Sequence, residues 1–209
     1  MKSIYFEKLL SNLAENPDYN HEMPQAKEEF ERFAGPIYES DRYYDSRINS
    51  FHNWYLLDRP LKSRGVTPLI SYLEQNETQL DEADRKGFQE LEHNLHSVFE
   101  LLRSQGGRTR VRDLLTGKKF DVDGQGETEF MDKNTLFNSR IFTHEGKFFF
   151  SNYFLLHPGG VYKLIVSKAK KVRKAKTDTK GFLFQLVLFQ SRWDQYKQME
   201  LHNIYRFES

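Results

Sequence analysis

Hydrophobic residues in the first 93 positions recur at helical spacing. One run with steps of 4, 3 and 4 residues lies on a single face of a helix predicted over 41–58, for which Ser40 is the expected N-cap. Its members are Tyr44, Ile48, Phe51 and Tyr55. Start and stop residues predict shorter helices near 4–13, 25–33, from Thr67-Pro68 onward and over 82–93. The pattern therefore predicts a helical N-terminal region over 1–93.

From about residue 94 the spacing becomes that of strands. Thr116-Gly117 and His144-Glu145-Gly146 are turn sequences, each between two runs of strand-forming residues. The runs are 97–102, 109–115, 118–122, 136–143 and 147–156. They predict about five short antiparallel strands, and hence a small antiparallel sheet or partly open barrel over 94–157.

Helical spacing returns after Pro158. One helix carries Val161, Leu164, Ile165, Lys168 and Val172 on one face, and the charged segment 174–181 is expected to be a mobile loop. A second helix has large side chains at Phe182, Leu186, Phe189, Trp193 and Tyr196. The fold class is therefore α+β, with two C-terminal helices over 158–209 that pack on the sheet, and we expect one compact unit.

Composition narrows the possible chemistry. The chain has 209 residues, 15% of them aromatic, which is enough to bury a sizeable core. It has no Cys, which excludes disulfides, thiolate nucleophiles and Cys-ligated metals, and we expect no metal and no cofactor. Near the N-terminus, Glu7 and Lys8 interrupt the apolar run that a signal peptide would need. No stretch reaches the 18 apolar residues of a membrane-spanning helix. We therefore expect a cytoplasmic protein with no membrane span.

The net charge of +1 conceals an uneven distribution. Residues 1–100 hold 11 Lys and Arg against 19 Asp and Glu, whereas residues 101–209 hold 20 against 11. The two parts therefore carry −8 and +9. Either they attract each other within the fold, or the basic part meets an anionic partner.

Seven Lys and Arg lie within residues 168–180, opposed only by Asp178. A helix would place Lys163, Lys170 and Lys174 on one face. The candidate contacts for nucleic acid or another polyanion are Lys163, Lys170, Lys171, Arg173, Lys174 and Lys176. The alternative is a solvated helix end, since cations are favourable near a helix C-terminus.

Three consecutive aromatic residues, Phe148, Phe149 and Phe150, lie on one predicted strand. Exposed rings beside a basic groove can stack on the bases of a single strand. The alternative is that these rings belong to the core, covered by the flanking helices.

Catalytic and metal signatures are lacking in the sequence. The seven His are dispersed, and a predicted helix end separates His93 from His96. Asp58, Asp113 and Asp121 adjoin apolar segments, but Asp113 is better explained as the end of a strand running into a turn. The sequence has no nucleophile elbow, phosphate-binding glycine loop or zincin helix, so we assign no catalytic residue.

Three stretches together carry a family resemblance: residues 51–61 with 65–69, residues 111–117 with 118–122, and residues 199–205. The combination resembles uncharacterised bacterial proteins in which a helical region leads to a D-L-x-T-G hairpin. Some of these are similar to regions that accompany the SEC-C zinc motif. The resemblance covers residues from about 45 to the end, and it implies a bacterial, intracellular protein with no assigned activity. The Cys-rich motif itself is absent, so zinc binding is not implied.

These observations favour a non-enzymatic intracellular interaction or regulatory module with an unknown protein partner. A second hypothesis is a nucleic-acid-binding protein that uses residues 163–180 and the adjoining sheet. A third is an enzyme whose site residues are dispersed along the sequence.

Overall fold

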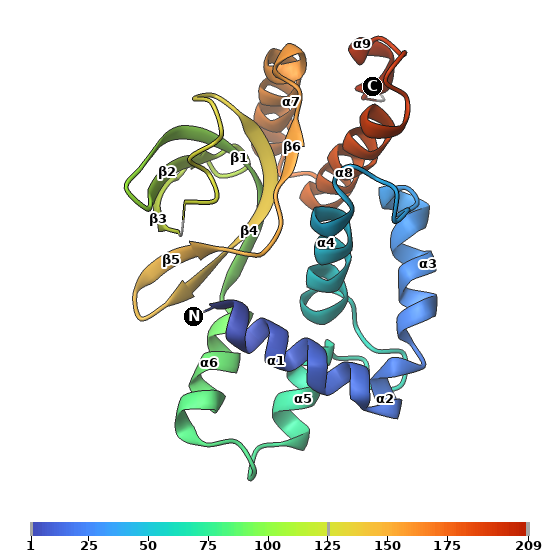
Figure 1. The fold of residues 1–209 in the computed structure, drawn as a ribbon, viewed down its shortest axis with the longest axis vertical. Coiled ribbons are helices and arrows are strands. Elements are labelled where there is room, and N and C mark those ends of the chain that lie inside the picture. The colour runs from blue at the N-terminus through green and yellow to red at the C-terminus, as the bar shows by residue number, and fades with distance from the viewer. Residues whose placement is uncertain (1, 125, 208–209) are drawn as a thin grey trace.

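The computed structural model describes residues 2–124 and 126–207, apart from the side chains of residues 2–4 and 18. Within this part of the chain, helices come first, strands follow and helices return (Figure 1). The α+β class expected from the sequence is therefore confirmed.

The N-terminal helices are α1 (Lys2–Glu15), α2 (Pro17–Asn20), α3 (Met23–Ala34), α4 (Tyr44–Leu57), α5 (Pro68–Gln75) and α6 (Glu82–Glu92). α5 and α6 begin as predicted, because the side chains of Thr67 and Asp81 accept backbone N–H groups of their first turns. The expected start of α4 is wrong. Asp41 forms a turn with Tyr38, so the helix begins only at Tyr44 and Ser40 does not cap it.

The strands are β1 (Asn94–Gln105), β2 (Arg108–Asp113), β3 (Lys119–Asp123), β4 (Leu136–His144), β5 (Lys147–Phe150) and β6 (Leu155–His157). Their order is β1-β2-β3-β5-β4-β6, and β1 also pairs with β4, which closes five of them into a barrel. β1 pairs with β4 over residues 94–100 and with β2 over residues 99–105. A register shift between Leu101 and Arg103 interrupts the pairing with β2. The pairings are antiparallel except for one parallel contact of β3 with β5, and the strand expected over 147–156 is split into β5 and β6.

The C-terminal elements are η1 (Gly159–Val161), α7 (Tyr162–Ala175), α8 (Thr179–Gln195) and α9 (Leu201–Ile204). The loop expected over 174–181 is wrong, since only residues 176–178 separate α7 from α8. Two expected core positions are also wrong. Leu164 is 40% exposed because Ala169 takes the buried position on α7, and Tyr196 is 53% exposed because it lies just beyond the end of α8.

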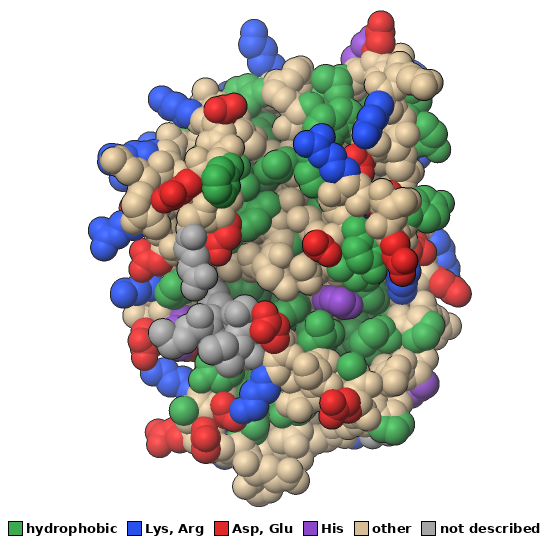
Figure 2. All heavy atoms as spheres, viewed as in Figure 1, with side chains coloured by type: hydrophobic (Ala, Val, Ile, Leu, Met, Phe, Trp, Pro, Cys, Tyr) green, Lys and Arg blue, Asp and Glu red, His purple; other side chains and the backbone are tan. Residues whose placement is uncertain are grey.

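Three groups of buried side chains connect these elements. One fills the barrel, and one joins α7 and α8 to the barrel residues Val98, Leu114 and Leu136. The largest lies among the N-terminal helices and includes Phe142 of β4, Leu155 of β6 and Val187 of α8. The core is therefore shared between the regions that the sequence separates. On the face shown in Figure 2, Lys and Arg side chains lie along the barrel edge, interleaved with Asp and Glu.

Candidate nucleic-acid interface

β2 carries three arginines on the outer face of the barrel. Side chains alternate along this strand, so its intervening residues are buried while Arg108, Arg110 and Arg112 are 85%, 54% and 38% exposed. β3 places Asp123 and Asp121 opposite the first two, at 4.0 and 3.8 Å between the charged atoms. Such exposed pairs contribute about 0–1 kcal/mol, so these two arginines can exchange their partners for another anion.

Arg112 has a different environment from the other two. Its Nε donates to Glu100 at 2.7 Å, and Glu100 is only 3% exposed. The same carboxylate accepts a hydrogen bond from the hydroxyl of Tyr162 at 2.7 Å, which raises the pKa of that hydroxyl. Arg112 therefore helps to attach the first turn of α7 to β1 and β2.

The turn after β2 is organised by a fully buried carboxylate. Asp113 accepts hydrogen bonds from the hydroxyl of Ser97, from the backbone N–H of Leu115, and from both the backbone N–H and the hydroxyl of Thr116. Asp113 is thus the end of a strand running into a turn, as expected, and its oxygens are occupied by structural donors.

Gly117, in the same turn, brings β2 and α7 together. Its φ is +79°, a region that favours glycine. A Cβ at this position would overlap the guanidinium of Arg173 on the last turn of α7. Arg173 therefore lies directly on the β2–β3 turn, beside the exposed Lys118 and Lys119.

The six candidate contact residues lie on α7 or directly after it, and all six are exposed. Lys163, Lys170 and Lys174 point away from the buried face, which consists of Val161, Ile165, Ala169 and Val172. Lys176 follows the helix in a left-handed conformation with φ 49°. Lys171 lies on a different side of α7, the side that also carries Lys168. There the ammonium of Lys168 lies 5.5 Å from the ring centre of Phe207.

The contact of Arg173 with Gly117 makes β2, the β2–β3 turn and α7 adjoining elements, and we call their exposed cations, with Arg103 of β1, the basic surface. It consists of Arg103, Arg108, Arg110, Lys118, Lys119, Lys163, Lys170, Arg173 and Lys174. From the sequence we expected the helical members and, for the strands, only an adjoining sheet; Arg103, Lys118 and Lys119 were missed. The alternation of side chains along each strand was the available signal. It places Arg103 on the same face as its cross-strand partner Arg110, and Lys119 on the same face as its partner Arg112.

The aromatic strand does not contribute to this surface. Phe148 and Phe150 pack against the hydrophobic residues inside the barrel, and Phe149 lies on the opposite side near His144, 6.3 Å between ring centres. Phe148 and Phe150 therefore pack as core residues, whereas Phe149 is partly buried on the other side of the strand.

The other candidate carboxylates are engaged in structural contacts. Asp58 forms an ion pair with Arg140, and Asp121 forms one with Arg110. His93 ends α6 and is exposed, whereas His96 is part of β1, where burial lowers its pKa to about 3. Across residues 2–124 and 126–207, no group of three His, Asp or Glu side chains is arranged to hold a metal ion.

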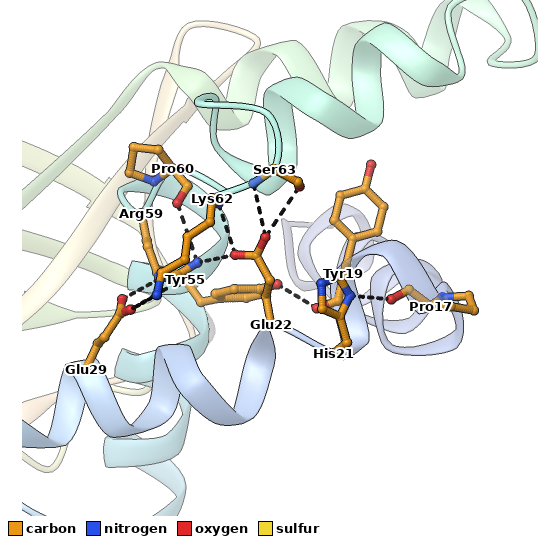
Figure 3. Close-up of polar contacts among 10 residues, drawn as sticks. All are labelled: Pro17, Tyr19, His21, Glu22, Glu29, Tyr55, Arg59, Pro60, Lys62 and Ser63. Carbon is orange, nitrogen blue, oxygen red and sulfur yellow. Dashed lines mark hydrogen bonds and ion pairs between the residues drawn. The ribbon is translucent and has the colours of Figure 1, made fainter.

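A buried charge cluster lies among the N-terminal helices (Figure 3). Arg59, 4% exposed, donates to Glu22 at 2.9 Å and to Glu29 at 2.7 Å. The hydrogen bond from Arg59 lowers the pKa of Glu29 to about 2. Burial would raise the pKa of Glu22, but Arg59 and the backbone N–H groups of Lys62 and Ser63 outweigh it and hold that pKa below normal. The cluster fastens the loop after α4 to α3.

Residues 8–190 match DUF7986, a family of unknown function. The chain belongs to this family. The match covers the barrel, α7 and most of α8, and it agrees with the expectation of an uncharacterised family. No curated protein and no solved structure matches the chain. In the part of the chain that the structure describes, no helix combines the length and apolar character needed to cross a bilayer.

Proposed function

We propose that this chain is a non-enzymatic binding module that holds single-stranded nucleic acid along the basic surface. The observation that carries the proposal is the contact of Arg173 with Gly117. It joins the last turn of α7 to the turn after β2, so the exposed lysines of α7 and the exposed arginines of β2 lie on adjoining elements, an arrangement suited to several phosphates.

The architecture of the barrel supports the same proposal. Small five-stranded Greek-key barrels include the OB-fold, which binds oligonucleotides on the face of its second and third strands. In this chain β2 and β3 are those strands, and their outer face carries Arg108, Arg110 and Lys119. Architecture alone does not determine function, so the exposed charges on these strands are the stronger support.

Fluorescence anisotropy with a labelled single-stranded oligonucleotide tests the proposal. If about five cations contact phosphates, log affinity should fall against log salt concentration with a slope of about −3.5. Reversing two charges of the exposed α7 face, Lys170→Glu with Lys174→Glu, should weaken binding about tenfold or more at low salt, because two attractive contacts become repulsive.

The matched control is the pair Arg64→Glu with Lys86→Glu. It changes the net charge equally, and both of its residues are exposed in the N-terminal region. The control should bind nearly as well as the wild type. Absence of binding at low salt, or equal losses in the two pairs, would contradict the proposal. The unknown protein partner would then be the better hypothesis, and an enzyme with dispersed site residues would come after it.

The family resemblance supports a second, coarser proposal. We infer that the protein is bacterial and cytoplasmic, and that some of its relatives are parts of longer chains that also carry the SEC-C motif. Chains in which a DUF7986 region is fused to that motif would support the inference. Secretion of the native protein from its source cell would contradict the cytoplasmic location.

A further inference from the structure

The loop between β3 and β4 holds one large apolar side chain in water. Phe130 is 95% exposed, the highest value among the large hydrophobic side chains that are exposed in the described residues. The next, Tyr38 and Tyr196, are each 53% exposed. A single exposed apolar side chain is ordinary by itself, so the position of Phe130 relative to the basic surface decides what it can do.

The residues on both sides of Phe130 are fixed to the barrel. Thr128 is 2% exposed, and its hydroxyl forms hydrogen bonds with Ser104 at 2.9 Å and with Thr109. Met131 packs against the hydrophobic residues inside the barrel. Backbone hydrogen bonds link Asn134 and Thr135 to Leu101. The loop is thus anchored before and after the ring, and the exposure of Phe130 follows from a defined conformation.

The anchored loop lies beside one end of the basic surface. Glu129, next to Phe130, accepts the backbone N–H of Gly107 at 3.1 Å, and Gly107 directly precedes Arg108 on β2. Of the acidic residues near this point, Glu129 has this N–H partner, and Asp123 lies 4.0 Å from Arg108 and 3.9 Å from Lys147. Glu127 and Asp132 also flank the ring in the sequence. The loop that carries the ring therefore adjoins the start of the arginine strand, and the carboxylates of Glu129 and Asp123 are compensated.

We infer that Phe130 stacks on an unpaired base of the nucleic acid bound along the basic surface, and that it thereby favours single strands over duplex. The inference rests on the proposed function. Arginines and lysines contact phosphates, which are present in single strands and in duplexes alike. A base has a free face only where it is unpaired, and aromatic side chains stack on such faces with little regard to sequence. The ring would therefore supply selectivity for single strands, which the charges alone cannot.

The test compares Phe130→Ala with the wild type on one sequence presented as a single strand and as a duplex. The variant should bind the single strand about fivefold or more weakly, in line with the loss of one stacked base. Its affinity for the duplex should stay within about twofold, and its salt slope should be unchanged because no cation is lost. Phe130→Trp should keep the preference for single strands, and Tyr38→Ala, which removes an exposed ring from the segment between α3 and α4, should change nothing.

The outcomes separate this inference from the proposed function. If Phe130→Ala binds the single strand normally while Lys170→Glu with Lys174→Glu loses binding, the stacking inference is wrong and the function stands. Equal losses on single strand and duplex also overturn it. A change in sedimentation mass without a change in affinity would identify Phe130 as a contact between copies of the chain, and that too overturns the inference. If no variant weakens binding, both proposals fail.

Discussion

The N-terminal helices and the barrel with α7 use arginine in opposite ways. Arg59 is 4% exposed and held by two carboxylates, whereas Arg108 is 85% exposed and lies 4.0 Å from a single one. A buried charge without a partner is strongly unfavourable, so the first arrangement is needed for folding. An exposed charge contributes little to folding, but its electric field extends into the solvent and can attract an anion. The basic excess of the second half is therefore displayed at the surface.

This difference also bears on the two explanations of the uneven charge. The halves do attract each other at particular points, where Arg112 meets Glu100, Arg140 meets Asp58, and His144 meets Glu90. None of these three basic side chains belongs to α7. The ion pairs that join the halves therefore leave the candidate contact residues available for an external anion.

The largest expected effect comes from removing the buried cation. Arg59→Met leaves Glu22, 4% exposed, without its cationic partner, so the free energy of unfolding should fall by about 3–5 kcal/mol. Urea denaturation measures the change. Lys62→Met is the matched control, because Lys62 approaches the same cluster at 3.3 Å from Glu29 but its side chain is 56% exposed. The control should change stability by less than about 1 kcal/mol. Equal effects would show that burial is not what distinguishes the two cations.

Arg59→Met also tests the proposal that the N-terminal helices, the barrel and the C-terminal helices fold as one unit. Each of the two tryptophans reports on one region, Trp54 on α4 and Trp193 on α8. Because the largest buried group joins α3 and α4 to Phe142, Leu155 and Val187, Arg59→Met should shift the unfolding midpoint equally for both. The Trp54→Phe and Trp193→Phe backgrounds separate the two signals. A shift confined to Trp54 would mean independent domains.

Lowering the pH should destabilise the fold through a buried histidine at the C-terminal side. His157 is 5% exposed, and burial lowers its pKa to about 3. Its Nε2 lies 2.8 Å from Asn138 and its Nδ1 lies 3.0 Å from the hydroxyl of Tyr205. The unfolded chain takes up this proton near pH 6.5 and the folded chain does not, so stability should fall as pH falls below about 6.5. The contribution of this one group is at most about 1.4 kcal/mol per pH unit.

His52 and His96 act in the same direction, because burial lowers their pKa values to about 4 and about 3. Chemical denaturation at pH 7.5 and pH 5.0 measures the sum. His157→Gln should reduce the difference between the two pH values, since one of the three groups no longer titrates. An unchanged difference would show that His157 keeps a normal pKa in the folded chain.

The next effect concerns the contact between the β2–β3 turn and α7. Gly117→Ala should cost about 1–2 kcal/mol for the left-handed backbone, with a further cost for displacing Arg173. Gly146→Ala is the control, because its φ is +74° but open space surrounds the position. The excess cost at Gly117 should vanish when Arg173→Ala is added. If it persists, the turn and α7 are not in the contact on which the basic surface depends.

Sequence patterns predicted most of the elements but not how they meet. Helix starts at Thr67 and Asp81 were readable because a local side chain caps each one. The start of α4 was not, because the turn at Asp41 competes with the cap expected at Ser40. Charge clustering found the lysines of α7. The contact between Gly117 and Arg173 joins residues 56 positions apart, and no local pattern reports such a contact. The closure of the barrel through β1 and β4 is non-local for the same reason.

The smallest expected effect on stability belongs to the surface that we propose to bind nucleic acid. Lys170→Glu with Lys174→Glu should change the free energy of unfolding by no more than about 1 kcal/mol, because both side chains are exposed. The sign should be slightly unfavourable, since Lys174 lies in the last turn of α7, where a cation interacts with the C-terminal end of the helix. Yet the same pair should lose most of its affinity for the oligonucleotide, whereas Arg59→Met, examined where it is still folded, should keep it. If the double reversal destabilised the chain as strongly as Arg59→Met, the lysines of α7 would be structural and the contrast between the two regions would fail.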